Sequence, residues 1–327
     1  MELVTGAHTG QGIGRPSKVA IVGAGSVGST LAYACLMRGV ARTVALYDLN
    51  TDKVRAEALD LGHGSQFMPA AQVIGSDDIE VCRDADIVVV TAGAKQQPGQ
   101  SRLELAGATI DLTRVLMPEL IEVAPDAIYL MVTNPVDVVT YAALKFSQLP
   151  PNRLFGTGTV LDSSRLRYLV ANKLNVAVQN VHAYIAGEHG DSEIPLWSSA
   201  FIGSVPLLQW NETGRGSLDE NERKAIEREV ITAAYQVIEG KGATNYAIGM
   251  AGARIIEAVL KDEQRVLPVS SLLNDYAGID DVCLSVPTIV GRAGIETVLP
   301  INFSIEEHRG MLRSAKAVRA VAKEFGL

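Results

Sequence analysis

The stretch KVAIVGAGSVG, residues 18–28, decides how the first half of the chain is expected to fold. Its first five residues are mostly apolar and resemble a buried strand, its glycines follow the spacing GxGxxG, and a helical pattern continues over residues 27–38. A second strand-like run, TVALY at 43–47, ends at Asp48, twenty residues after the last glycine of the motif. Strand, glycine turn, helix and acid in this order predict a dinucleotide-binding βαβ unit, the alternative being a glycine turn that only packs its helix.

The same alternation of apolar runs and helical patterns continues to about residue 155. Strands are expected at 18–22, 43–47, 71–74, 86–90, 127–131 and 153–155, and helices at 27–38, 51–61, 103–124 and 138–146. Continuous apolar runs are typical of strands buried on both faces of a parallel sheet. Two sets of three such strands predict an α/β fold of the Rossmann type, a doubly wound parallel sheet with a cleft where the winding reverses.

The pattern changes after about residue 160. Longer amphipathic helices are expected at 162–174, 218–239 and 304–325, around strand-like runs at 266–270 and 281–286. This mixture predicts a second, α+β domain that carries the substrate site. We therefore divide the chain into a flexible N-terminal arm at 1–17, a nucleotide-binding domain at 18–160 and the α+β domain at 161–327.

Composition restricts the class of protein. Apolar residues make up 47% and charged residues 20% of the 327 positions, as in ordinary globular proteins. The net charge of −8 argues against nucleic acid or an anionic membrane as a partner. The three cysteines lie far apart, which fits a reducing compartment and offers no thiolate metal site, so no metal is expected. Neither a membrane-spanning run nor a signal peptide is found, so a cytoplasmic location is expected.

The glycines and the acid also predict which cofactor binds. Gly23 suits a tight turn, Gly25 the close approach of a pyrophosphate, and Gly28 the contact between helix and strand. The N-terminus of the helix that follows attracts the anion. Asp48 can accept hydrogen bonds from the adenosine ribose hydroxyls and would repel a 2′-phosphate. NAD is therefore expected rather than NADP.

Polar residues gather in further segments where strands are expected to end. These segments are TAGAKQQPGQSR at 91–102, TNPVD at 133–137, LDSSRLR at 161–167 and GEHGD at 187–191. In this order they resemble the corresponding segments of the L-lactate dehydrogenases and the lactate-like malate dehydrogenases. The resemblance runs from residue 18 to the C-terminus and leaves only the N-terminal arm uncovered.

The resemblance implies a role for each matching residue. His189 corresponds to the proton donor and acceptor, Asp162 to the carboxylate that orients it, and Arg165 to the clamp on the substrate carboxylate. Arg102 corresponds to the loop arginine that polarises the substrate carbonyl, and Asn134 to the amide beside the substrate oxygen and the nicotinamide. The other residues that the resemblance assigns to the site are Thr244, beside the substrate tail, and the cofactor contacts Val27, Lys53, Gly93, Ala94, Val132, Thr157 and Ile248.

The residue types suit the reversible reduction of a 2-oxo acid. A histidine titrates near neutral pH, so it can give a proton to the developing alkoxide and take it back, and a buried carboxylate fixes its tautomer. An arginine binds a carboxylate through two parallel hydrogen bonds. Taken singly, His189 could be structural, Asp162 a helix N-cap, and the arginines ordinary charges. Their joint occurrence behind a dinucleotide-binding motif favours the catalytic interpretation.

Gln96 bears on the choice of substrate. Relatives that reduce oxaloacetate carry an arginine at the matching position, whereas a neutral glutamine suits the methyl group of pyruvate. Pyruvate and L-lactate are therefore the expected substrates, unless Gln96 only points to solvent. Malate dehydrogenase activity, or action on another 2-hydroxy acid, is the alternative. A non-catalytic NAD-binding subunit is a third possibility, which the complete set of catalytic residues disfavours.

A candidate effector site lies near the predicted active site. Arg167 follows Arg165 by two residues on the expected helix, so it should point the other way, toward another subunit. Together with His182 it is similar to the arginine and histidine of bacterial enzymes activated by fructose 1,6-bisphosphate, and both groups can bind phosphate. An interface salt bridge and a buried histidine are the alternative. The resemblance also implies a homo-oligomer, with a tetramer expected and a dimer as the alternative.

Overall fold

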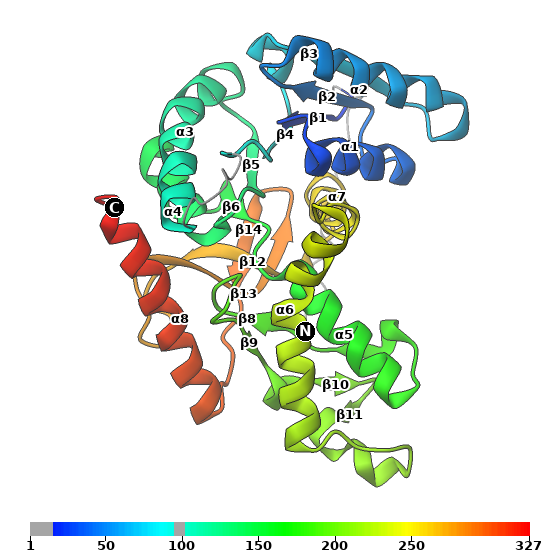
Figure 1. The fold of residues 1–327 in the computed structure, drawn as a ribbon, viewed down its shortest axis with the longest axis vertical. Helices are drawn as coiled ribbons and strands as arrows, with labels where there is room; N and C mark the ends of the chain where they lie inside the picture. Colours follow the sequence, from blue (N-terminus) through cyan, green and yellow to red (C-terminus); the bar gives the residue numbers. More distant parts are fainter. Residues whose placement is uncertain (1–15, 95–101) are drawn as a thin grey trace, which may run out of the picture.

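The computed structural model describes residues 16–94 and 102–327, with side chains from residue 105 after the gap, and its first half is a parallel sheet between helices (Figure 1). Six strands lie in the order β3-β2-β1-β4-β5-β6, and all five neighbouring pairs are parallel. This is the strand order of the Rossmann fold, so the predicted doubly wound sheet is confirmed. The strands are β1 (Lys18–Val22), β2 (Thr43–Tyr47), β3 (Gln72–Ser76), β4 (Ile87–Val90), β5 (Ile128–Met131) and β6 (Leu154–Gly156).

Every one of these strands except β3, at the edge, contributes side chains to two cores, because successive residues of a strand point to opposite faces of the sheet. Val19 and Ile21 of β1 are buried in one core together with helix α1, whereas Ala20 and Val22 are buried in the other with α3 and α4. This explains why the strands are apolar throughout rather than at every second residue. The α-helices among the described residues of this half are α1 (Ser26–Arg38), α2 (Thr51–His63), α3 (Arg102–Val123) and α4 (Val136–Ser147).

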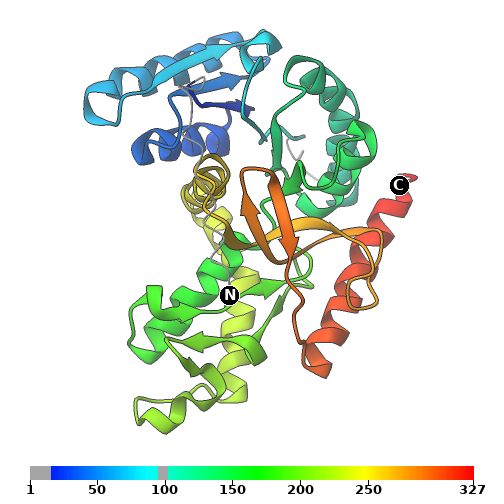
Figure 2. The ribbon, with the colours of Figure 1, turned by 180° about the vertical axis from the view of Figure 1, so that it is seen from behind.

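The second half continues the same sheet in the antiparallel sense. Strand β12 (Arg265–Leu273) pairs with β6 at Ser270 and Gly156, and β13 (Val282–Gly291) and β14 (Gly294–Val298) follow outward. Figure 2 shows these strands between the Rossmann half and the remaining helices. The other elements are α5 (Val160–Leu174), α6 (Glu220–Lys241), α7 (Tyr246–Leu260), α8 (Ile305–Glu324) and the short strands β7 (Val181–His182), β8 (Ile185–Ala186), β9 (Ile194–Pro195), β10 (Phe201–Ile202) and β11 (Val205–Pro206).

Helix α7 joins the two halves by packing on α1 (Figure 1). Gly249 of α7 lies against Thr30 of α1 so closely that an added Cβ would be 2.8 Å from a methyl carbon of the threonine. At the other end of this contact the buried Glu257 pairs with Arg38 of α1, with Arg254 of α7 and with Lys261, the residue after α7. Burial opposes ionisation of Glu257, but these cations lower its pKa to about 2. The packing fixes the start of α7 against the nucleotide-binding helix.

Sequence patterns located most long elements to within a few residues but missed α7 and β14. The α7 sequence, YAIGMAGARIIEAVL, carries two glycines, which are disfavoured inside a helix, and it contains only two charged residues. Most of the expected N-terminal arm, 1–17, lies outside the described residues. Within the described part of the chain, no helix is both long and apolar enough to cross a membrane.

Candidate active site

The glycine motif forms the turn between β1 and α1. Gly23 has φ +102°, and an added Cβ there would be 2.8 Å from the backbone nitrogen of Ala92, which follows β4. A Cβ at Gly28 would collide with the carbonyl oxygen of Gly23. A Cβ at Gly25, by contrast, would meet no atom within 4 Å. Packing therefore requires the outer two glycines, and Gly25 leaves open space of the kind that a pyrophosphate needs.

Asp48 is fixed beside this turn by backbone groups. Its Oδ2 accepts a hydrogen bond from the backbone nitrogen of Ala24 at 2.7 Å, and its Oδ1 accepts one from Asn50 at 3.0 Å. Gly25 at the N-cap of α1 provides no side-chain cap, and the first turn of the helix contains no acid. The helix N-terminus thus keeps free amides and a positive dipole end for an anion. This cradle fits NAD: the N-terminus of α1 would hold the pyrophosphate, and Asp48 would hold the adenosine ribose.

The other predicted cofactor residues lie mainly along the carboxyl edge of the sheet. Val27 of α1 and Ile248 of α7 are half-buried and pack against the same core, so the contact between these helices brings them to one region. Lys53 is exposed in the first turn of α2, shortly after Asp48. The residues that follow the strands are Gly93 and Ala94 after β4, Val132 after β5 and Thr157 after β6.

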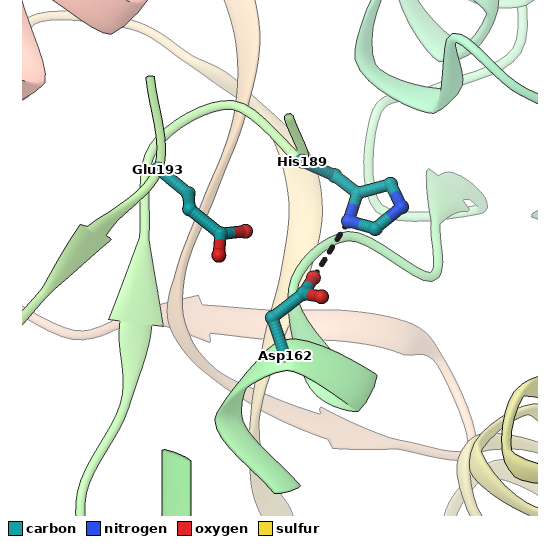
Figure 3. A group of neighbouring side chains, drawn as sticks. All are labelled: Asp162, His189 and Glu193. Atoms are coloured by element: carbon teal, nitrogen blue, oxygen red, sulfur yellow. Dashed lines mark hydrogen bonds and ion pairs between the residues drawn. The ribbon is translucent and has the colours of Figure 1, made fainter. Parts of the chain in front are cut away.

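Asp162 and His189 form a hydrogen-bonded pair (Figure 3). His189 Nδ1 lies 2.6 Å from Asp162 Oδ2, and the aspartate is 1% exposed. Arg165, one turn further along α5, donates from Nη1 to the other oxygen, Asp162 Oδ1, at 2.6 Å. The alternative in which Asp162 is a helix N-cap is wrong, because α5 begins at Val160 with Thr159 as its N-cap and the carboxylate faces His189 instead.

Three elements hold His189 in place. Gly187, at the start of its loop, exchanges two backbone hydrogen bonds with Ser285 of β13, at 2.8 and 2.9 Å. The backbone nitrogen of His189 donates to Oδ2 of Asp137 in α4 at 2.7 Å, and Ser270 of β12 donates to Asp137 Oδ1 at 2.5 Å. Burial raises the pKa of Asp137 to about 6, although both hydrogen bonds favour its charged form. Asp137 therefore positions the histidine through its backbone.

The electrostatics of the pair favour an imidazolium facing a carboxylate. Burial disfavours the charged form of His189, but the charge and hydrogen bond of Asp162 outweigh it and raise the pKa to about 9. Burial likewise opposes ionisation of Asp162, yet His189 and Arg165 hold its pKa below the usual value. At neutral pH His189 thus carries a proton on Nε2, the ring nitrogen that faces away from Asp162 (Figure 3).

The structure describes the remaining predicted substrate residues in less detail. Asn134 lies in the turn between β5 and α4, where its Oδ1 accepts from the backbone nitrogen of Val136 at 3.3 Å. Thr244 is half-buried in the segment between α6 and α7. Arg102 is the first residue of α3, but its side chain lies outside the described atoms, and Gln96 lies wholly outside the described residues.

Sequence reasoning assigned no role to two acids that border this site. Asp137 belongs to the TNPVD segment, where it looks like an ordinary acid in the first turn of a helix. Glu193 lies four residues after His189, and one oxygen from it, one from Asp162 and one nitrogen of His189 all lie within 4.8 Å of one another. Only the burial of these carboxyl groups distinguishes them from surface acids, and burial comes from the tertiary packing.

Family models match nearly the whole chain. Residues 17–156 match the lactate/malate dehydrogenase NAD binding domain, and residues 159–325 match the lactate/malate dehydrogenase alpha/beta C-terminal domain. The chain belongs to the lactate/malate dehydrogenase family. The resemblance seen in the motifs is therefore confirmed, and so is NAD as the cofactor of the Rossmann half.

Individual members of the lactate/malate dehydrogenase family match over similar lengths. The L-lactate dehydrogenase of Bifidobacterium animalis subsp. lactis is 57% identical over 313 residues, which are 95% of this chain and 98% of the relative. That of Thermoanaerobacter sp. (strain X514) is 42% identical over 95% of this chain and 100% of its own. The crystal structure of the minor L-lactate dehydrogenase from Enterococcus mundtii has a TM-score of 0.90 at 39% identity, covering 94% of this chain and 98% of that one.

Proposed function

We propose that the chain is an NAD-dependent L-lactate dehydrogenase that interconverts pyruvate and L-lactate. The observation that carries this proposal is the buried Asp162–His189 pair with Arg165 on the same carboxylate, in a chain whose first half binds NAD. The identity of 57% to an L-lactate dehydrogenase favours the same reaction. A non-catalytic NAD-binding subunit has no use for this arrangement.

Each group of the pair has a distinct task in the reaction. When bound, NADH supplies the hydride that reduces the keto carbon. The imidazolium of His189 gives its Nε2 proton to the developing alkoxide, and in the reverse direction neutral His189 removes the proton of the alcohol. Asp162 stays ionised and holds the ring in one tautomer. Arg165 binds the substrate carboxylate, for which it must share or release its bond to Asp162.

Gln96 is the residue that we assign to contact the side chain of the substrate. This assignment rests on the resemblance alone, because Gln96 lies outside the described part of the chain. A neutral amide suits the methyl group of pyruvate, whereas the second carboxylate of oxaloacetate would remain unpaired. The test of the proposed function is a comparison of pyruvate, oxaloacetate and longer 2-oxo acids at saturating NADH. A preference of the unmodified protein for oxaloacetate would favour malate dehydrogenase activity instead.

Substituting Gln96→Arg should move this preference toward oxaloacetate. The new guanidinium offers the second carboxylate a bidentate partner and leaves an unpaired charge next to pyruvate, so both effects act in one direction. A change of a few kcal/mol corresponds to about a hundredfold shift in the ratio of kcat/KM for the two substrates. Steady-state kinetics of both proteins provide the measurement, with Gln148→Arg, outside the site in the αL residue after α4, as control. An unchanged ratio would remove Gln96 from the specificity site.

We further propose that Arg167 and His182 bind an effector such as fructose 1,6-bisphosphate. Arg165 bonds to Asp162, whereas Arg167 on the same helix donates from Nε to the carbonyl of Ala183 at 2.8 Å and lies over the Tyr184 ring. The two arginines therefore reach in different directions. His182 is exposed on β7, one residue before Ala183, so both side chains border one short stretch of chain.

The effector proposal predicts a response that depends on Arg167. Fructose 1,6-bisphosphate should lower the apparent KM for pyruvate, and Arg167→Gln should abolish the effect, because a guanidinium binds phosphate in a way that an amide cannot. Lys173→Gln, on the exposed end of the same helix, is the control and should leave the response intact. Calorimetry that detects no binding of the bisphosphate at millimolar concentration would refute the effector site and favour an interface salt bridge.

Assembly and location complete the proposal. We propose a homo-oligomer, with a tetramer expected, that works in the cytoplasm and regenerates NAD during fermentation of glycolytic pyruvate. Large apolar side chains exposed on the packed helices α1 and α7, namely Tyr33, Met37 and Met250, suit an interface between subunits. All three cysteines are buried and unpaired, as a reducing compartment favours. Sedimentation equilibrium measures the number of subunits.

A further inference from the structure

Glu193 is a buried carboxyl group for which the reaction described above has no use. Glu193 is only 5% exposed, and it lies in the loop that carries His189, just before β9. Figure 3 shows its carboxyl group directed toward Asp162 and His189, and oxygen atoms of both acids lie within 4.8 Å of each other. Its Oε1 is buried and has no hydrogen-bond partner among the described residues. A polar atom in this state is costly unless it gains a partner at some stage of the reaction.

The charges around Glu193 decide its protonation. Asp162 and Arg165 face it from α5, His189 from its own loop, and Glu227 from α6. Burial, and then the negative charge of Asp162, raise the pKa of Glu193 to about 9, although His189 and Arg165 act in the opposite direction. Two carboxyl groups this close do not both ionise readily, and Asp162 is the one that two cations stabilise. At neutral pH Glu193 is therefore a carboxylic acid, which has a proton to donate.

Substrate binding creates a need for such a donor. In the structure both oxygens of Asp162 are engaged, Oδ2 by His189 and Oδ1 by Arg165. When Arg165 turns to the carboxylate of the substrate, Oδ1 loses its partner while it stays buried. An unpaired oxygen on a buried carboxylate is strongly disfavoured, and it would leave Asp162 free to rotate away from the histidine.

We propose that Glu193 is a positioning residue, whose carboxyl proton forms a hydrogen bond to Asp162 when Arg165 releases that carboxylate to bind the substrate. A rotation of the flexible glutamate side chain suffices, because its oxygen already lies within 4.8 Å. The inference rests on the proposed function, since it requires Arg165 to bind the substrate carboxylate. No proton is transferred, and Glu193 keeps Asp162 aligned with His189 during the reduction.

Two substitutions separate hydrogen bonding from packing. Glu193→Gln keeps the length of the side chain and a donor, so kcat/KM for pyruvate at pH 7 should stay within about threefold of the unmodified protein. Glu193→Met has similar length but no donor, so kcat/KM should fall by about ten- to a hundredfold while the affinity for NADH is unchanged. Equal activity of the two variants would show that the site needs only a side chain of this size, and would overturn the proposal.

The pH profile gives a second readout that packing alone does not change. Full activity in pyruvate reduction requires His189 and Glu193 to be protonated together, so just above pH 9 log(kcat/KM) of the unmodified protein should fall by more than one unit per pH unit. In Glu193→Gln only His189 titrates, and the slope should be about one. A slope of one in both proteins would overturn the role of Glu193.

An infrared measurement tests the hydrogen bond without relying on turnover. Oxamate, the amide isostere of pyruvate, is bound to the protein with NADH, and the difference spectrum is recorded with and without the Glu193→Gln substitution. A carbonyl band of a protonated carboxyl group should move to lower frequency on oxamate binding and be missing in the variant. Binding of oxamate without this band overturns the inference alone. Failure of the unmodified protein to bind oxamate overturns the proposed function, and the inference with it.

Discussion

Replacing His189 by asparagine is expected to lower kcat for pyruvate reduction by about a thousandfold, with the affinity for NADH unchanged. The asparagine side chain can still fill part of the space of the imidazole ring and make part of its hydrogen bonds. Its amide does not give up a proton near neutral pH. The nucleotide cradle at Gly23–Gly28 and Asp48 does not depend on the histidine, so cofactor binding should persist. Stopped-flow turnover and fluorescence titration with NADH measure the two quantities separately.

The control for this substitution is His63→Asn, an exposed histidine at the end of α2. It should leave both kcat and NADH affinity unchanged. If the His189 variant retained more than about a tenth of normal turnover, another group would have to supply the proton, because general acid catalysis contributes at least a hundredfold in typical enzymes.

The pH dependence follows from the raised pKa of His189. The imidazolium is the competent form for pyruvate reduction, and with a pKa of about 9 it prevails at neutral pH and is lost as the pH rises through that value. Lactate oxidation needs the neutral ring, so it should increase as the pH rises from neutral toward 9. Because the charge of Asp162 raises this pKa, Asp162→Asn should move both profiles toward lower pH. Profiles centred at the same pH in the variant would mean that Asp162 does not set the titration.

Local patterns predicted the nucleotide-binding half well because its structure is largely specified by neighbours in sequence. Buried parallel strands are continuously apolar, Gly28 is required by its contact with Gly23 inside the motif, and Gly23 is required by its own positive φ. Asp162 and Arg165 are three residues apart on one helix, a spacing at which side chains meet, so their contact was also within reach of the sequence.

Features produced by distant contacts escaped prediction. Helix α7 carries two glycines at which it packs closely on α1, and glycine is disfavoured inside helices, so only the tertiary contact explains why a helix forms there. Asp137 and Glu193 become functional candidates only when the fold buries them beside His189. Their neighbours Ser270 and Asp162 lie 133 residues and 31 residues away in sequence, respectively, so no local pattern indicates them. Tertiary packing, rather than residue type, identifies these acids.

Replacing Arg165 by lysine is expected to lower kcat/KM for pyruvate by about a thousandfold, although the positive charge is retained. The side chain of Arg165 is only 16% exposed, and its Nη1 already bonds to Asp162 at 2.6 Å. A planar guanidinium can bind a carboxylate through two parallel hydrogen bonds, whereas an ammonium acts as a single point of charge. The lysine should therefore hold the substrate weakly and in several orientations.

The size of the effect separates the two roles that Arg165 can have. If it only neutralises Asp162, lysine should substitute well, and KM for pyruvate would remain within about tenfold of normal. If it also binds the substrate carboxylate, KM should rise steeply, kcat should fall less, and oxamate binding should weaken in parallel. Lys173→Gln on the same helix is the control, because this lysine pairs with Glu222 away from Asp162.

The dependence of kcat/KM on pH above neutral, measured in Arg165→Lys, completes the test. Its retained charge should keep the titration of His189 near its normal pH, so a loss of activity without a shifted profile assigns the loss to substrate binding rather than to the proton donor.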